Sequence, residues 1–274
     1  MHLASVHTYP VKSCRRIDHD GAPVRVEPWG LAGDRRWLVT DLDGRGLTQR
    51  ELPAMTRVRP APEPAGNLRL AADGQVDLLV PEPVEGEPVE VSVHGTKVSA
   101  TAAGPAADAW LTGVLGLEVR LAWLGDPTQR PVDSAYAQPD DRVSFADAYP
   151  LLLTNAASLD ALNGWIAAEG DGEGPLPMTR FRPNVVVAGA AAWAEDDWLG
   201  RRLRIGAVTF RVVKPCDRCV VTTTDQETGA KGREPLRTLG RYRNVDQELL
   251  FGVHLIPDPP YGEITAGDPI QPLD

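Results

Sequence analysis

Glycine and proline interrupt this chain so often that it leaves little room for long helices. The 274 residues include 26 glycines and 25 prolines. Proline breaks helices and central strands, and glycine favours tight turns. The segments between them are short and apolar, which predicts many short strands separated by turns.

Strand-like segments recur along the whole chain, and helix-like segments are fewer. The predicted strands are residues 3–9, 24–29, 36–41, 47–49, 68–70, 76–80, 89–94, 97–101, 151–153, 184–188, 202–205 and 208–213. Helices are predicted over 106–115, after Asn155 as a capping residue, and over 235–242 with Pro235 at the first position. The polar loop 169–177 is expected to be mobile. The fold class is therefore mainly β (α+β), consistent with a closed barrel plus appended elements.

The charge balance argues against two classes of partner. The formal net charge is −10, whereas nucleic acids and anionic membranes both require a basic face. We find no apolar run of about 18 residues and therefore expect no membrane span. Three cysteines do not form a secreted disulfide framework, and the first ten residues lack the pattern of a signal peptide. These features favour a reducing cytoplasm.

The sharpest local feature is a C-x-x-C segment at residues 216–219. One interpretation is half of a zinc site, but the five histidines and Cys14 supply no partner pair at zinc-like spacing. A second is a redox dithiol, which usually precedes a helix, whereas residues 220–224 are predicted to be extended. A third is a soft thiolate ligand for another metal. Taken alone, the segment most favours two buried cysteines that pack as small apolar side chains.

Four segments in the right order resemble the MOSC family, named for the C-terminal domain of molybdenum-cofactor sulfurase. Residues 214–229 (KPCDRCVVTTTDQETG) resemble its signature, and Gln226-Glu227 stand where Pro-Asp is common. Residues 9–14 (YPVKSC), 33–37 (GDRRW) and 180–184 (RFRPN) resemble its other motifs. The resemblance covers nearly the whole chain and points to the subgroup of the amidoxime-reducing components.

The resemblance implies a MOSC β-barrel at residues 125–274 and an N-terminal β-rich MOSC-type domain at residues 1–124, which share one site. It implies that Cys219 is the protein ligand to molybdenum, while Cys216 is expected to be structural and Cys14 has no assigned role. The residues expected to bind the molybdopterin cofactor are Lys12, Ser13, Arg35, Arg182, Asn184, Thr154 and Asn155. The substitution at Gln226-Glu227 is expected to affect a turn and not the metal.

The implied activity is the molybdenum-dependent reduction of N-hydroxylated small molecules. No cysteine follows Cys219, so we expect no intrinsic iron–sulfur cluster and expect electrons from a separate flavoprotein or ferredoxin. The competing hypothesis is non-catalytic. It is a carrier of the molybdenum cofactor, or a sulfur carrier that uses Cys219 as a persulfide.

Overall fold

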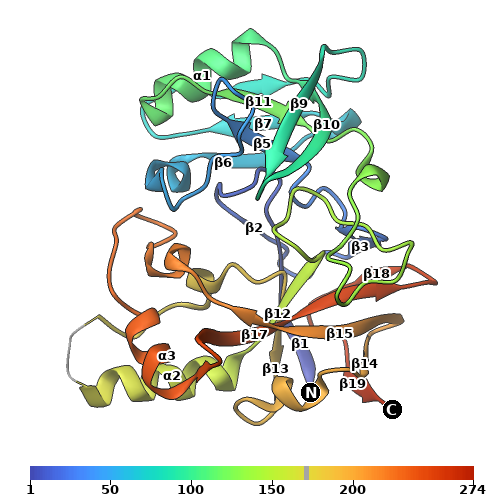
Figure 1. Ribbon diagram of the computed structural model, residues 1–274, viewed down its shortest axis with the longest axis vertical. Helices are drawn as coiled ribbons and strands as arrows, with labels where there is room; N and C mark the ends of the chain where they lie inside the picture. Colours follow the sequence, from blue (N-terminus) through green and yellow to red (C-terminus); the bar gives the residue numbers. More distant parts are fainter. Residues whose placement is uncertain (170–172) are drawn as a thin grey trace.

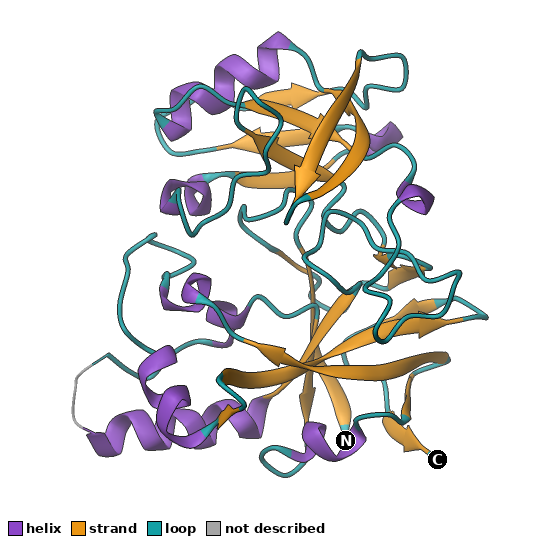
Figure 2. Ribbon diagram, viewed as in Figure 1, coloured by secondary structure: helices purple, strands orange, loops and turns teal. Residues whose placement is uncertain are grey.

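The computed structural model describes residues 1–169 and 173–274. It confirms the mainly β fold class with a few helices, arranged in two lobes (Figures 1 and 2). Residues 170–172, part of the loop expected to be mobile, lie outside the described residues.

A curled sheet of nine strands forms the lower lobe in Figure 1. Its order is β19-β14-β15-β17-β12-β13-β1-β2, with β16 paired to β17, and only β12 and β13 run parallel among these pairs. The strands are β1 (His2–Thr8), β2 (Ile17–Asp18), β12 (Leu151–Asn155), β13 (Val185–Ala188), β14 (Arg202–Ile205), β15 (Val208–Asp217), β16 (Asn244–Val245), β17 (Glu248–Asp258) and β19 (Ile270–Leu273).

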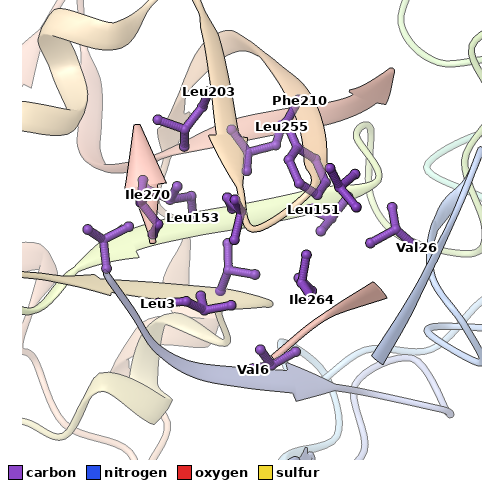
Figure 3. Packing of buried hydrophobic residues seen from close by; sticks show 14 of the residues in the cluster. Leu3, Val6, Val26, Leu151, Leu153, Leu203, Phe210, Leu255, Ile264 and Ile270 are labelled. Carbon is purple, nitrogen blue, oxygen red and sulfur yellow. The ribbon is translucent and has the colours of Figure 1, made fainter. Parts of the chain in front are cut away.

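Backbone hydrogen bonds between β1 and the segment that leads into β19 close the curl. Leu3 N donates to Asp268 O at 2.9 Å, and Gly267 N donates to Leu3 O at 2.7 Å. The alternating residues of these strands point inward and form one buried core (Figure 3). Leu3, Leu153 and Leu255 are fully buried there, because side chains on every second residue of a strand share a face.

The upper lobe contains two smaller antiparallel sheets. One has the order β5-β11-β10-β9 and the other β6-β7-β8. A third small sheet, β18-β3-β4, joins early and late parts of the chain. These strands are β3 (Val24–Glu27), β4 (Gly30–Leu31), β5 (Trp37–Thr40), β6 (Arg59–Pro62), β7 (Leu68–Ala71), β8 (Leu78–Val80), β9 (Pro88–Val93), β10 (Thr96–Ala102), β11 (Arg120–Trp123) and β18 (Glu263–Ile264).

Three α-helices cover the sheets: α1 (Pro105–Leu115), α2 (Ala156–Glu169) and α3 (Leu236–Tyr242). Helix α1 ends at Gly116, whose φ of 69° gives the left-handed C-cap that glycine favours. The predicted cap of α2 is confirmed, because Asn155 Oδ1 accepts a hydrogen bond from Ala157 N at 3.1 Å. Helix α3 begins one residue later than predicted, after Pro235. Among the described residues, no helix is both long and apolar enough to cross a membrane.

Two predicted extended segments are wrong. Residues 47–49 form no strand, and residues 220–223 form a 3₁₀ helix, η6 (Val220–Thr223). The cause in η6 is local, because Thr222 Oγ1 and Thr223 Oγ1 donate to the carbonyls of residues three positions earlier, at 2.9 and 2.8 Å. Such side-chain bonds compete with the extended conformation that β-branched residues otherwise favour.

The two halves of the chain interleave in space. Strand β1 lies in the sheet of the lower lobe, and β3 pairs with β18 near the other end of the chain. The division at residue 124 stays a prediction. Strands β1, β3 and β4 contribute Leu3, Val6, Val24, Val26 and Leu31 to the core of the second half, whereas Val11 and Cys14 pack in the core of the upper lobe. The segment after β1 therefore leads from the lower lobe to the upper one and passes the space between them.

Candidate functional site

An open cavity between the lobes is lined by residues from both halves of the chain. It encloses about 740 Å³ of space that continues into solvent. Its lining includes the ends of β15 and β12, the loop after β1 and a loop of the upper lobe. The lining residues are Lys12, Ser13, Arg35, Thr48, Arg50, Ala146, Asp147, Ala148, Tyr149, Leu151, Leu152, Phe181, Arg182, Asn184, Cys216, Arg218, Cys219, Val221 and His254.

Both cysteines of the C-x-x-C segment line this cavity, and each contacts a different arginine. Cys219 is half-buried at the N-terminus of η6, and Arg50 Nη2 lies 3.3 Å from its Sγ. Cys216 is buried, and Arg218 Nη1 lies 2.8 Å from its Sγ. Burial raises the pKa of the Cys216 thiol, but Arg218 and His254 lower it by more, so that the net shift is downward. Arg218 and His254 thus favour the thiolate of Cys216, and a thiolate is the form of cysteine that binds metals.

Three predicted cofactor residues, Lys12, Arg35 and Arg182, surround the cavity with positive charge. The guanidinium carbons of Arg35 and Arg182 lie 4.3 and 4.2 Å from the centroid of the Tyr9 ring. This buried ring holds both guanidinium groups in place through cation–π contacts. Burial lowers the pKa of Arg182 to about 10 and raises the pKa of Tyr9 to about 12. Arg182 therefore stays cationic at neutral pH.

Ser13, Arg35 and Arg182 share an uncommon backbone conformation. Their φ angles are 64°, 47° and 53°, in the left-handed region that non-glycine residues rarely adopt. Each lies in one of the motifs that carried the family resemblance. Such strained residues cluster at functional sites, because the surrounding structure must hold them there. The strain therefore supports a role for these three residues in binding.

An ion-pair network holds the opposite wall of the cavity. Lys12 Nζ forms an ion pair with Asp147 and donates to Phe145 O at 2.8 Å. Asp147 Oδ1 also lies 2.9 Å from His94 Nε2, which belongs to the turn between β9 and β10. Desolvation within the cleft raises the pKa of Asp147, but Lys12 and His94 lower it by more and hold it well below the usual range. Arg130 fixes the same loop through the carbonyls of Ser144, Ala146 and Asp147.

Gln226, which departs from the family pattern, contacts the cavity wall. Its Oε1 accepts from Arg182 Nη1 at 2.8 Å and from Gln49 Nε2 at 3.0 Å. Its Nε2 donates to Gln49 Oε1 at 2.9 Å, and Gln49 Nε2 donates to Ser13 O at 2.7 Å. The substitution was expected to affect only a turn. Its amide in addition positions Arg182 and joins the two lobes.

The remaining predicted residues lie at different depths. Asn184 lines the cavity, and its Oδ1 accepts from Arg35 Nη1 at 3.0 Å. Thr154 and Asn155 are buried and do not line it, and the Asn155 amide donates to Ala191 O and Glu195 Oε2. Cys14 is fully buried outside the lining, and burial raises the pKa of its thiol to about 12. The structure thus brings Lys12, Ser13, Arg35, Arg182, Asn184 and Cys219 together.

Sequence reasoning missed five polar residues of the cavity: Thr48, Arg50, Asp147, Tyr149 and His254. Arg50 and His254 lie outside the four recognised segments, and nothing in their local sequence suggests a site. They reach the cavity only through long-range pairing of strands and loops. Among residues 1–169 and 173–274, no group of three or more His, Cys, Asp or Glu side chains could hold a metal. A protein-only zinc site, one of the sequence alternatives, is thus not assembled in this part of the chain.

Comparisons with known proteins agree with the resemblance. The model of the MOSC N-terminal beta barrel domain matches residues 1–118, and that of the MOSC domain matches residues 140–271. Mitochondrial amidoxime-reducing component 1 of Homo sapiens is 32% identical over 293 residues, which cover 99% of this chain and 82% of that protein. Molybdenum cofactor sulfurase of Oryza sativa subsp. japonica is 29% identical, over 98% of this chain and 33% of that protein.

Proposed function

The chain belongs to the family of MOSC-domain proteins with an N-terminal MOSC β-barrel domain, and from that premise we propose that it is a molybdenum-dependent reductase of N-hydroxylated compounds. A function related to the molybdenum cofactor follows from its relatives, which are amidoxime-reducing components and cofactor sulfurases. The observation that carries the proposal is the accessible Cys219 thiol in a cavity rich in cations.

The residues of the cavity fit the chemistry of the cofactor. A molybdopterin carries a phosphate and a polar pterin, and Lys12, Arg35 and Arg182 are suited to both. Among the described residues, five cationic side chains line the cavity, and Asp147 is the single carboxylate there, although the chain carries a formal net charge of −10. Cys219 offers one soft ligand, and the dithiolene sulfurs of the cofactor would complete a sulfur-rich site.

Each residue of this chain would have a separate task. Cys219 would hold the metal, with Arg50 Nη2 next to its sulfur. Lys12, Ser13, Arg35, Asn184 and Arg182 would orient the cofactor by hydrogen bonds and charge. When bound, the cofactor supplies the two-electron oxygen-transfer chemistry, and the protein supplies geometry and electrostatics. The open side of the cavity would admit a small substrate.

Electrons would come from a separate flavoprotein or ferredoxin. We recognised no dinucleotide-binding G-x-G-x-x-G segment in the sequence. Molybdenum-replete protein should therefore reduce an amidoxime with a reduced viologen under anaerobic conditions, and should not do so with NADH alone. Rapid turnover with NADH alone would contradict the requirement for a separate donor.

Metal analysis of matched cysteine variants tests the ligand. Protein from a host that makes the cofactor should contain close to one molybdenum per chain. Cys219→Ala should lose both the metal and the activity, whereas Cys216→Ala should retain much of both. Stoichiometric zinc without pterin would refute the assignment. Full molybdenum without turnover by any donor would favour the cofactor carrier, and dependence on Cys219 without molybdenum would favour the persulfide carrier.

A further inference from the structure

We propose that His254 is the proton donor to the substrate in this cavity, an inference that rests on the proposed reductase function. His254 lies on β17, next to β12 and β15, and its side chain lines the same cavity as both cysteines. It is the only histidine among the cavity's lining residues in the described part of the chain.

The ring of His254 is held in place on one side and free at one nitrogen. It packs against Tyr149 with ring centroids 4.7 Å apart and the ring planes tilted by 31°, and it interacts with the Cys216 thiol. Its Nδ1 is buried and has no hydrogen-bond partner among the described residues. A buried polar atom without a partner is destabilising and needs an explanation. A substrate group that enters the cavity would supply the missing partner.

The other ionisable groups of the cavity are less suited to donate a proton. Asp147 is ionised because Lys12 and His94 hold its pKa low, and Lys12 itself donates to Asp147 and Phe145. Burial raises the pKa of Tyr149, and its hydroxyl points to Asp133 at 3.5 Å. The net downward shift in the pKa of Cys216 favours its thiolate, which cannot donate.

The charged groups near His254 already have partners of their own, so none of them occupies the unpaired Nδ1 of His254. Across β15 its register partner is Lys214, whose Nζ lies 3.5 and 3.7 Å from Glu248 and Asp217. Across β12 its partner is the apolar Leu152. Arg218 contacts Cys216, so that the Cys216 thiolate is already paired with a cation. Tyr149 packs against the His254 ring, and because burial raises the pKa of its hydroxyl, it is uncharged at neutral pH.

Proton donation by His254 supplies one of the two protons that the reduction consumes. An N-hydroxylated compound, R–NH–OH, takes up two electrons and two protons to give R–NH₂ and water, and its N–O bond breaks. The separate electron donor supplies the electrons. Protonated His254 gives one proton to the nitrogen as the N–O bond breaks. Solvent supplies the second proton, which converts the departing hydroxide to water, and solvent then reprotonates the ring. Histidine is the side chain that most often transfers protons in enzymes.

The test compares His254→Gln with wild type and with His2→Gln, an exposed histidine at the start of β1. All three proteins are made molybdenum-replete and assayed with reduced viologen and an amidoxime over a range of pH. We expect kcat of His254→Gln to fall by about 10²–10⁴-fold, the usual contribution of a general acid. The decline of wild-type kcat at high pH should disappear, and KM should change little. His2→Gln should behave like wild type.

Readouts other than activity separate proton donation from a structural role. Molybdenum and pterin content, and the Kd of the amidine product, should be the same in His254→Gln and in wild type. A kcat of His254→Gln within threefold of wild type, or an unchanged pH profile, would overturn the inference. Loss of molybdenum in His254→Gln would overturn it as well, because the residue would then support the cofactor site. If molybdenum-replete wild type fails with every donor, the proposed function fails first, and the inference falls with it.

Discussion

Replacing Gln226 with leucine should destabilise the protein through the contact between its lobes. Gln49 and Gln226 form two reciprocal amide hydrogen bonds at 3.0 and 2.9 Å, and their side chains are buried. Gln226→Leu leaves Gln49 Oε1 and one Arg182 N–H without partners. A buried polar group without a partner costs about 1–3 kcal/mol. The free energy of unfolding should therefore fall by roughly 3 kcal/mol, with the larger share from the charged group.

A double-mutant cycle tests the same contact more directly. Gln49→Leu alone should also be destabilising, because it leaves Ser13 O and the Gln226 amide with fewer partners. The double variant removes both amides, and apolar groups of similar shape can replace a hydrogen-bonded pair at little cost. Its loss of stability should be smaller than the two single losses together by about 1–2 kcal/mol.

Urea unfolding followed by circular dichroism measures these differences as shifts of the midpoint at constant slope. Gln75→Leu is the matched control, because Gln75 is exposed in a loop of the upper lobe, and its midpoint should not change. Fully additive losses of stability in the double variant would refute the reasoning. So would a loss below about 0.5 kcal/mol for Gln226→Leu, because a loss that small is typical of a surface substitution.

Two further predictions concern Arg50, which contacts Cys219, and the buried Cys14. Arg50→Met removes the side chain that contacts Cys219 Sγ at 3.3 Å and lines the same cavity, so protein from a host that makes the cofactor should contain less molybdenum per chain. Arg45→Met should have no effect, because Arg45 pairs with Asp41 and Glu51. Burial raises the pKa of the Cys14 thiol to about 12, above its value in the unfolded chain. The protonated thiol therefore stabilises the fold at lower pH, and this contribution to the free energy of unfolding is lost as the pH rises from about 9 to 12. Urea unfolding of Cys14→Ala should show a shallower decline over this window, and an equal slope in both proteins would contradict the assignment.

The sequence predicted many of the strands and the cavity residues that lie in recognised motifs, but it missed the long strand β17. Cys219, Lys12, Arg35 and Arg182 lie in motifs, and the structure brings all four to one cavity. Arg50 and His254 carry no such signal, because only the pairing of distant strands and loops brings them to Cys219. The same limit applies to β1, whose alternating apolar residues predict a strand but not that it joins the sheet of the second half. In η6, hydrogen bonds of threonine side chains override the strand preference of β-branched residues.

The closure of the curled sheet has a consequence for the order of folding. Strand β1 is made well before most of its partners, because only the short β2 lies near it in the sequence, whereas β13 and the segment around residues 267–270 follow much later. The strands β5–β11 of the upper lobe pair with one another and, at Trp37, with Val11, so they can fold while synthesis continues. The apolar face of β1, with Leu3 and Val6, stays without its complete core until the residues up to Ile270 have been made. Contacts between such distant residues form slowly, and an unpaired strand edge promotes aggregation in the meantime. Strand β1 is therefore made early but reaches its final place only after its distant partners have been made.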